Sequence, residues 1–237
     1  MIAVLARAGG IAPGARLVLD AEEARHVEVR RAKGGEAVTV LDGAGTRGFG
    51  RLVRHDERFA VDVERVTQEP RPPAVTLAVG AGDRDRFALV AEQAAQFGAT
   101  RIIPVESEHT RAVATRLRDS HLDRVRRRSR EALKQCGGAW EPEVTAPTAL
   151  ELVFSALLPG ARWLTDHAGG EAPSLSAEAP LTILVGPEGG FTAAERELAL
   201  QAGFVPVRLG PHILRFDTAA LAALSTAWQV RQRGAHG

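Results

Sequence analysis

The first part of the chain alternates apolar and polar residues with the period of β-strands. Residues 37–42 alternate in this way and end at a glycine turn, Gly43-Ala-Gly45. Residues 49–53 and 59–66 continue the pattern and are rich in β-branched and aromatic side chains. Short strands spread over the first 68 residues predict a small barrel.

The rest of the chain alternates apolar runs with segments of helical period. Strands are predicted at residues 75–79, 101–105, 181–185 and 205–209. Three helices are predicted from their start and stop signals, and a fourth over residues 219–230. The first helix starts at Asp83 and ends at Gly98. The second starts at Ser120-x-x-Asp123 and ends at Gly137-Gly138, and the third starts at Thr192-x-x-Glu195 and ends at Gly203. Strand and helix alternating in this way predict an α/β domain with a mostly parallel sheet covered on both faces.

A proline-rich linker separates the two patterns. Residues 70–73 contain three prolines, which disfavour both a helix and a central strand. We therefore expect a first domain at residues 1–68, a linker at 69–73 and a second domain at 74–237.

Composition narrows the class of protein. The chain of 237 residues is 45% hydrophobic and 25% charged, which is ordinary for a globular protein. Its apolar runs are too short to span a membrane, and no secretory leader is visible, so we expect a cytoplasmic protein. With one cysteine and no pair of histidines at helical spacing, we expect no disulfide and no metal.

Charge is concentrated in one segment although the net charge is only +1. Residues 111–134 hold nine basic and three acidic side chains. Five arginines lie between residues 124 and 130, and the two acids beside them, Asp123 and Glu131, cannot pair with all five. This segment therefore predicts contact with a nucleic acid backbone.

Two glycine-rich loops follow predicted strands near the end of the chain, at residues 186–192 and 210–218. Ligands of open α/β sheets bind at the carboxyl ends of strands, where glycine lets the backbone approach a ligand closely. Neither loop has the spacing of a nucleoside triphosphate or dinucleotide loop. The loop at residues 80–83 is too short for the glycine loop of a Rossmann-type methyltransferase.

Residues 184–199 (LVGPEGGFTAAERELA) and 209–224 (LGPHILRFDTAALAAL) resemble the two signature loops of the RsmE family. Members of that family are 16S ribosomal RNA uridine N3-methyltransferases of the SPOUT superfamily. Residues 26–33, 94–104 and 134–143 resemble further family segments, so the resemblance extends over the whole chain.

The resemblance implies a PUA-like N-terminal β-barrel and a C-terminal SPOUT domain with a trefoil knot, which forms a homodimer. It also implies S-adenosyl-L-methionine as methyl donor, and 16S rRNA or the assembled small ribosomal subunit as partner. The donor-site residues that it assigns are Leu164, Thr165, Gly186, Pro187, Glu188, Gly189, Gly190, Leu209, Gly210, Ile213, Leu214, Thr218 and Ala219. We expect Gly189→Val nearly to abolish donor binding, because a valine side chain would enter the space where the backbone meets the donor and would resist any φ above zero.

Arg215, beside the second loop, is the candidate catalytic residue, because a fixed cation can stabilise charge that develops on the uracil oxygens. The alternative is that Arg215 only pairs with Asp217 or with a phosphate. No general base stands out: Asp217 and Glu188 are candidates, but either can instead be a helix cap or a loop brace.

The sequence also offers candidates for RNA binding in both domains. These residues are His26, Arg30, Arg31, Lys33, Arg124, Arg126, Arg127, Arg128 and Arg130. The chain departs from the family pattern at Phe216, Asp217 and Lys134, which stand where a small hydroxyl residue, Glu and Glu are usual. Two other functions therefore stay open: methylation of tRNA, and RNA binding without catalysis.

Overall fold

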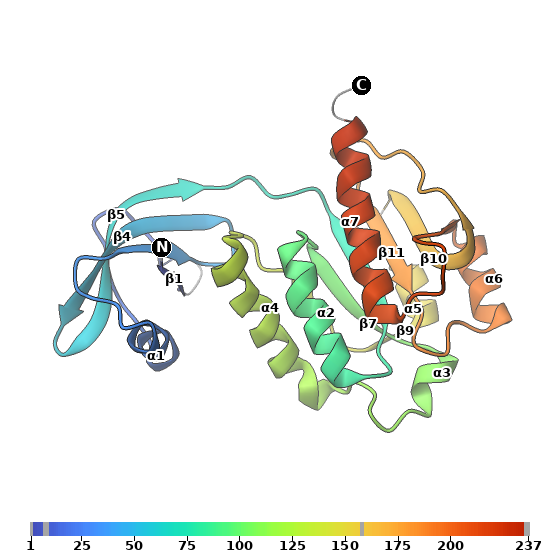
Figure 1. Ribbon diagram of the computed structural model, residues 1–237, viewed down its shortest axis with the longest axis horizontal. Coiled ribbons are helices and arrows are strands. Elements are labelled where there is room, and N and C mark those ends of the chain that lie inside the picture. The colour runs from blue at the N-terminus through green and yellow to red at the C-terminus, as the bar shows by residue number, and fades with distance from the viewer. Residues whose placement is uncertain (1, 7–9, 157–158, 235–237) are drawn as a thin grey trace. The chain divides into compact units, whose positions relative to one another are not determined.

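The computed structural model describes residues 2–6, 10–156 and 159–234. The chain forms two compact units: Met1–Pro72 with Arg130–Glu141, and Pro73–Ser129 with Pro142–Gly237. Residues 130–141 thus belong with the N-terminal unit, although the sequence pattern placed them in the C-terminal domain. Figure 1 shows the elements of both units.

The N-terminal unit is built on one mixed sheet. Its strands are β1 (Ile2–Leu5), β2 (Arg16–Val18), β3 (Ala37–Leu41), β4 (Thr46–His55) and β5 (Arg58–Gln68). The described residues pair in the order β1-β3-β4-β5-β2, with β1 and β3 parallel and the other pairs antiparallel. Alternate residues of the strands, among them Val38, Val40 and Val61, form its apolar core with Val27.

A helix that the strand pattern did not predict completes this unit. Helix α1 (Ala21–Val29) begins at Asp20, whose carboxylate accepts hydrogen bonds from the backbone N–H groups of Glu22 and Glu23. Only Val27 and Glu23 of the helix are buried. So short an apolar face gives little periodic signal in the sequence.

The second unit is an α/β domain, as predicted. Its helices are α2 (Arg84–Gln96), α3 (Glu108–Arg111), α5 (Leu150–Ser155), α6 (Ala193–Gln201) and α7 (Phe216–Gly234), together with α4 (Leu122–Cys136) as far as Ser129. Its strands are β6 (Val75–Gly80), β7 (Arg101–Glu106), β8 (Glu143–Val144), β9 (Thr148–Ala149), β10 (Ala161–Gly170), β11 (Leu181–Val185) and β12 (Val205–Val207). Within the described ranges these strands pair in the order β12-β10-β11-β6-β7-β8, with β9 also on β7, and every pairing is parallel.

Helices cover both faces of the parallel sheet. Side chains that alternate along the strands, such as Leu77 and Ile183, join α2, α7 and the start of α4 in one core. The intervening residues, such as Ala78 and Leu184, pack against α5 and α6 in a second core. Small residues on α7, among them Ala220, let it pack closely against α2, and the two helices lie side by side in Figure 1.

The predicted helix signals are mostly confirmed. Asp83 caps α2, Gly98 follows it with φ 75°, and the Thr192–Glu195 capping box starts α6. The prediction for Ser120 is wrong, because this residue lies inside a short 3₁₀ turn (Asp119–His121) that continues directly into α4. Strand β12 is also shorter than predicted, and α7 begins earlier, at Phe216.

Candidate active site

A cavity of about 480 Å³ lies where β10, β11 and β12 end and α7 begins. Both glycine-rich loops line it, as expected from their places after β11 and β12. The structure brings together here most of the residues that the sequence assigned to the donor site, with the candidate catalytic arginine. These are Thr165, Gly186, Pro187, Glu188, Gly189, Gly190, Leu209, Gly210, Ile213, Leu214, Ala219 and Arg215.

Two of the assigned donor-site residues do not line this cavity. The Leu164 side chain is 2% exposed and packs in the core against α5 and α6, because alternate residues of a strand face opposite sides of a sheet. Thr218 lies in the first turn of α7, where its backbone N–H donates a hydrogen bond of 2.9 Å to Asp217 Oδ1.

Several cavity residues were missed by the sequence reasoning. They are Asp166, His167, Val185, Val207, Arg208, His212 and Phe216. A partial signal existed, since most of these residues directly adjoin assigned ones or lie within the second glycine loop. Phe216, one of the departures from the family pattern, is 3% exposed and joins the core between the sheet and α2.

Asp166 is a partly buried carboxylate on the cavity wall. Burial opposes its ionisation, but hydrogen bonds from Arg196 Nε (2.7 Å) and from the Ala168 backbone N–H (2.8 Å) outweigh burial and lower the pKa of Asp166. Asp166 is therefore ionised, and Arg196 holds it in place on the β10 side of the cavity.

The first glycine loop is held by its own turn and by a neighbouring helix. Gly190 donates its N–H to Pro187 O (2.8 Å) and has φ 69°, the left-handed region that glycine adopts without strain. His109 Nδ1, on α3, donates to the Gly190 carbonyl oxygen at 2.9 Å. Gly189 lines the cavity, and a Cβ on it would face His109 Nδ1 at 3.1 Å; the positive φ of this loop is at the next residue, Gly190.

The loop after β6 packs tightly against the same glycine loop. A Cβ on Gly80 would overlap the backbone nitrogen of Pro187, and one on Gly82 would lie 2.7 Å from Glu188 Oε2. Residues 80–82 are therefore a backbone support for the cavity wall, a role that their short length did not suggest.

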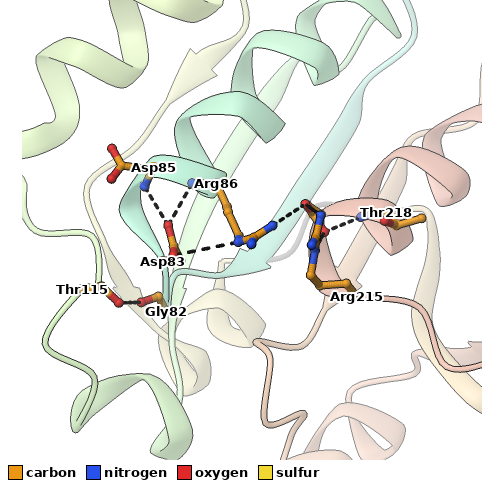
Figure 2. Close-up of polar contacts among 8 residues, drawn as sticks. Gly82, Asp83, Asp85, Arg86, Thr115, Arg215 and Thr218 are labelled. Atoms are coloured by element: carbon orange, nitrogen blue, oxygen red, sulfur yellow. Dashed lines mark hydrogen bonds and ion pairs between the residues drawn. The ribbon is translucent and has the colours of Figure 1, made fainter.

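Arg215 is held by a carboxylate rather than free. Its Nε and Nη2 donate to Oδ1 and Oδ2 of Asp217, each at 2.6 Å, in a two-pronged pair. Arg86, from the start of α2, reaches Asp217 Oδ2 at 3.5 Å, so two cations share one carboxylate (Figure 2). The hydrogen bond from Arg215 lowers the pKa of Asp217 although burial opposes this, so Asp217 is ionised at neutral pH.

The arginines of α4 find more partners than the sequence reasoning allowed. Arg124 pairs with Asp85 (2.7 Å), Arg126 with Asp123 (3.7 Å), Arg128 with Glu92 (3.6 Å) and Arg130 with Glu141 (3.5 Å). Three of these four acids come from elsewhere in the chain, so the earlier count of two nearby acids was too low. Arg127 is exposed, and no ion pair to a described acid is present.

The N-terminal candidates lie at the end of α1 and in the turn that follows. Arg30, Arg31 and Lys33 are exposed there, and Arg31 has φ 54°. His26 is partly buried, and burial, followed by the charges of Lys134 and Arg30, lowers its pKa. The imidazole is therefore neutral at pH 7 and is a poor ligand for phosphate.

Lys134, another departure from the family pattern, also lies in this unit. It forms ion pairs with Glu23 (2.9 Å) and Glu131 (2.5 Å), and the side chains of Lys134 and Glu23 are 7% and 4% exposed. A buried cation opposite Glu23 gives this position a structural role.

Comparison with known proteins agrees with the fold and the cavity. The sequence model of the RNA methyltransferase domain family matches residues 69–228, which include both glycine loops. The class is therefore RNA methyltransferase, as the sequence predicted.

More specific relatives share the name ribosomal RNA small subunit methyltransferase E. The protein of that name from Synechocystis sp. is 32% identical over 206 residues, covering 83% of this chain and 67% of the relative. The one from Mycobacterium bovis is 31% identical over 235 residues, covering 93% and 88%. The chain belongs to the ribosomal RNA small subunit methyltransferase E family.

A solved relative has the same fold over nearly its whole length. The crystal structure of ribosomal RNA small subunit methyltransferase E from Neisseria gonorrhoeae, bound to S-adenosyl methionine, superposes with a TM-score of 0.83 at 27% identity. The superposition covers 97% of this chain and 98% of that one.

Among the described residues, no helix is long and apolar enough to cross a membrane. Their acidic, histidine and cysteine side chains also form no group of three or more that could hold a metal ion.

Proposed function

We propose that this protein transfers a methyl group from S-adenosyl-L-methionine to N3 of a uridine in 16S rRNA of the small ribosomal subunit. The observation that carries the proposal is the cavity between the two glycine loops, in a chain of this enzyme family. The relatives named above are small subunit rRNA methyltransferases, which favours rRNA over tRNA as the substrate.

The cavity suits the methyl donor in size and chemistry. Its volume of about 480 Å³ is within the range of small-molecule sites, and Leu209, Ile213 and Leu214 offer apolar contacts. A Cβ on Gly186 would come within 3.3 Å of the Gly190 backbone, so glycine keeps the loop narrow there. The bound donor supplies an electrophilic methyl group on a sulfonium, and these residues would orient it.

Arg215 supplies the fixed cation in this proposal. An arginine has five N–H donors, and the Asp217 pair uses Nε and one Nη2–H. The opposite edge of the guanidinium stays available, and the side chain is 53% exposed at the cavity. Asp217 thus orients Arg215, whose free edge can stabilise negative charge on a uracil oxygen as N3 loses its proton.

The two carboxylates that are candidates for the general base differ in their hydrogen-bond partners and exposure. Asp217 already accepts hydrogen bonds from Arg215 and from the Thr218 N–H, and Arg86 is beside it, so it is a brace. Glu188 is exposed and lines the cavity, so of the two we assign it to accept the N3 proton.

The finer features of the architecture stand as part of the proposal. They are a PUA-like barrel formed by the N-terminal sheet, a trefoil knot in the SPOUT domain, and a homodimer formed through that domain. Support for the homodimer comes from the exposed apolar side chains of Trp228 on α7 and Leu89 on α2, which are 60% and 40% exposed.

The test is nucleoside mass spectrometry of rRNA and tRNA from a strain that lacks the gene, with calorimetry of donor binding to the pure protein. Loss of N3-methyluridine from 16S rRNA, restored by the wild-type gene but not by the Arg215→Ala variant, is the expected result. Loss of the modified nucleoside from tRNA instead would mean that tRNA is the substrate. If the protein binds RNA but does not bind the donor, its function is RNA binding without catalysis.

A further inference from the structure

Residues 109–118, which run from within α3 to the 3₁₀ turn before α4, are basic and contain no acidic residue. Residues 109–118 hold three arginines and a histidine, between Glu108 and Asp119. The following helix has more arginines, but four of them pair with carboxylates. The charge that remains for a partner is therefore concentrated before α4 rather than on it.

This segment, residues 109–118, is fixed against the loops that support the cavity. At its start, His109 holds the Gly190 carbonyl oxygen. Further on, Thr115 Oγ1 donates to Gly82 O (3.1 Å), as Figure 2 shows, and the Leu117 N–H donates to Ala81 O (2.9 Å). The first glycine loop and the segment at residues 109–118 are therefore neighbours.

The arginines of this segment have no acidic partner in the part of the chain that the structure describes. Arg111 and Arg118 are exposed, and neither forms an ion pair with any acid that the structure describes. Arg84 is half-buried and likewise forms no ion pair with a described acid; its backbone N–H donates to Thr115 O at 2.9 Å, so it lies beside the segment. Arg116 donates to the Arg111 carbonyl oxygen, which stabilises the turn that presents Arg111.

We propose that Arg84, Arg111 and Arg118 form a phosphate-binding surface for the RNA strand that leads to the target nucleotide. The inference rests on the proposed function and names which surface holds the substrate. Exposed arginines bind phosphate through paired N–H groups, and each such contact releases counterions from the RNA. A strand held here passes beside the loops that form the cavity wall.

The test compares two double variants of equal charge change. Arg111→Gln/Arg118→Gln removes unpaired cations, and the control Arg124→Gln/Arg128→Gln removes arginines that pair with Asp85 and Glu92. The affinity for a fluorescein-labelled oligouridylate is measured against salt concentration. We expect the first variant to flatten the log–log slope by about 1.4, since each contact to a single strand contributes about 0.7. The control should keep the wild-type slope.

Donor binding by calorimetry should be the same in all three proteins, which shows that both variants fold. An unchanged slope in the first variant, or an equal loss in the control, would overturn the assignment of this surface. Failure of the proposed function has a different signature: small subunits would not be methylated by the wild type, whether or not the slopes differ.

Discussion

Replacing Arg215 by alanine tests the catalytic part of the proposal most directly. The change removes the guanidinium that Asp217 holds by two bonds of 2.6 Å. Arg86 stays at 3.5 Å from Asp217, so the carboxylate keeps one cation, and the protein should fold. Donor affinity should change little, because glycine loops and apolar side chains form most of the cavity wall.

The size of the expected effect follows from how Arg215 is held. Removal of one preorganised donor to a developing oxyanion lowers kcat by a factor on the order of 10²–10³. The side chain is 53% exposed before substrate binds, so water competes for its free edge. We therefore expect a loss of about 10² in both kcat and kcat/KM, because the contact forms mainly in the transition state.

Two further variants separate charge from geometry. Arg215→Lys keeps the charge but cannot pair with Asp217 through two nitrogens, so it should recover only part of the rate. Asp217→Asn keeps the size of the side chain but weakens the orientation of Arg215, so about a tenfold loss of kcat is expected. The kcat of each variant is compared with that of the Arg215→Ala protein.

The assay is steady-state methylation of purified small ribosomal subunits with labelled donor, together with calorimetry of donor binding. A rise in KM for the subunit with kcat unchanged would refute the catalytic role and make Arg215 an RNA anchor. Loss of donor affinity in Arg215→Ala would place the residue in the donor site.

Three other substitutions and one control test the loops and the N-terminal unit. Gly190→Ala should lower donor affinity about tenfold in calorimetry, since a left-handed φ of 69° costs an L-residue about 1–2 kcal/mol, whereas Gly34→Ala, in open space, should change nothing. Gly80→Ala should lower the melting temperature as well as donor affinity, because its Cβ would overlap Pro187; normal values for both would contradict the tight packing. Burial is the largest cause that lowers the pKa of His26 below its usual 6.5, so as pH falls the unfolded chain takes up this proton first and the fold loses stability. His26→Gln should remove part of the loss of stability between pH 7 and pH 5, measured by urea titrations. An unchanged pH dependence of the stability would contradict the lowered pKa of His26.

Features that depend on neighbouring residues could be predicted from the sequence. Asp83 and Thr192 start helices through hydrogen bonds to backbone groups two or three residues away, so the letters alone carry the signal. The two glycine loops directly follow strands, and in a parallel sheet that order places them at one edge. The uridine N3 target, the knot and the homodimer rest on the family resemblance and stay predictions.

Features that depend on distant partners could not be predicted. Arg86 and Asp217 are separated by 131 positions, and no local pattern reports that they meet. The α4 arginines were judged against neighbours in sequence, while Asp85 and Glu92 reach them from α2. The side of the sheet that Leu164 faces is likewise set by the register of β10 against β11 and β12.

The division of the N-terminal unit into two stretches of chain has a consequence for its synthesis. Its second stretch supplies the hydrogen bond from Arg130 to Ala6 O (2.7 Å), the Lys134–Glu23 pair, and the Trp140 indole N–H bond to Pro70 O (3.0 Å). A ribosome makes residues 73–129 between the two stretches, so the unit that begins the chain cannot be complete when its own strands emerge. Glu23 stays without its cation until residue 134 has left the exit tunnel, so the N-terminal unit can finish folding only after the first stretch of the second unit has been made.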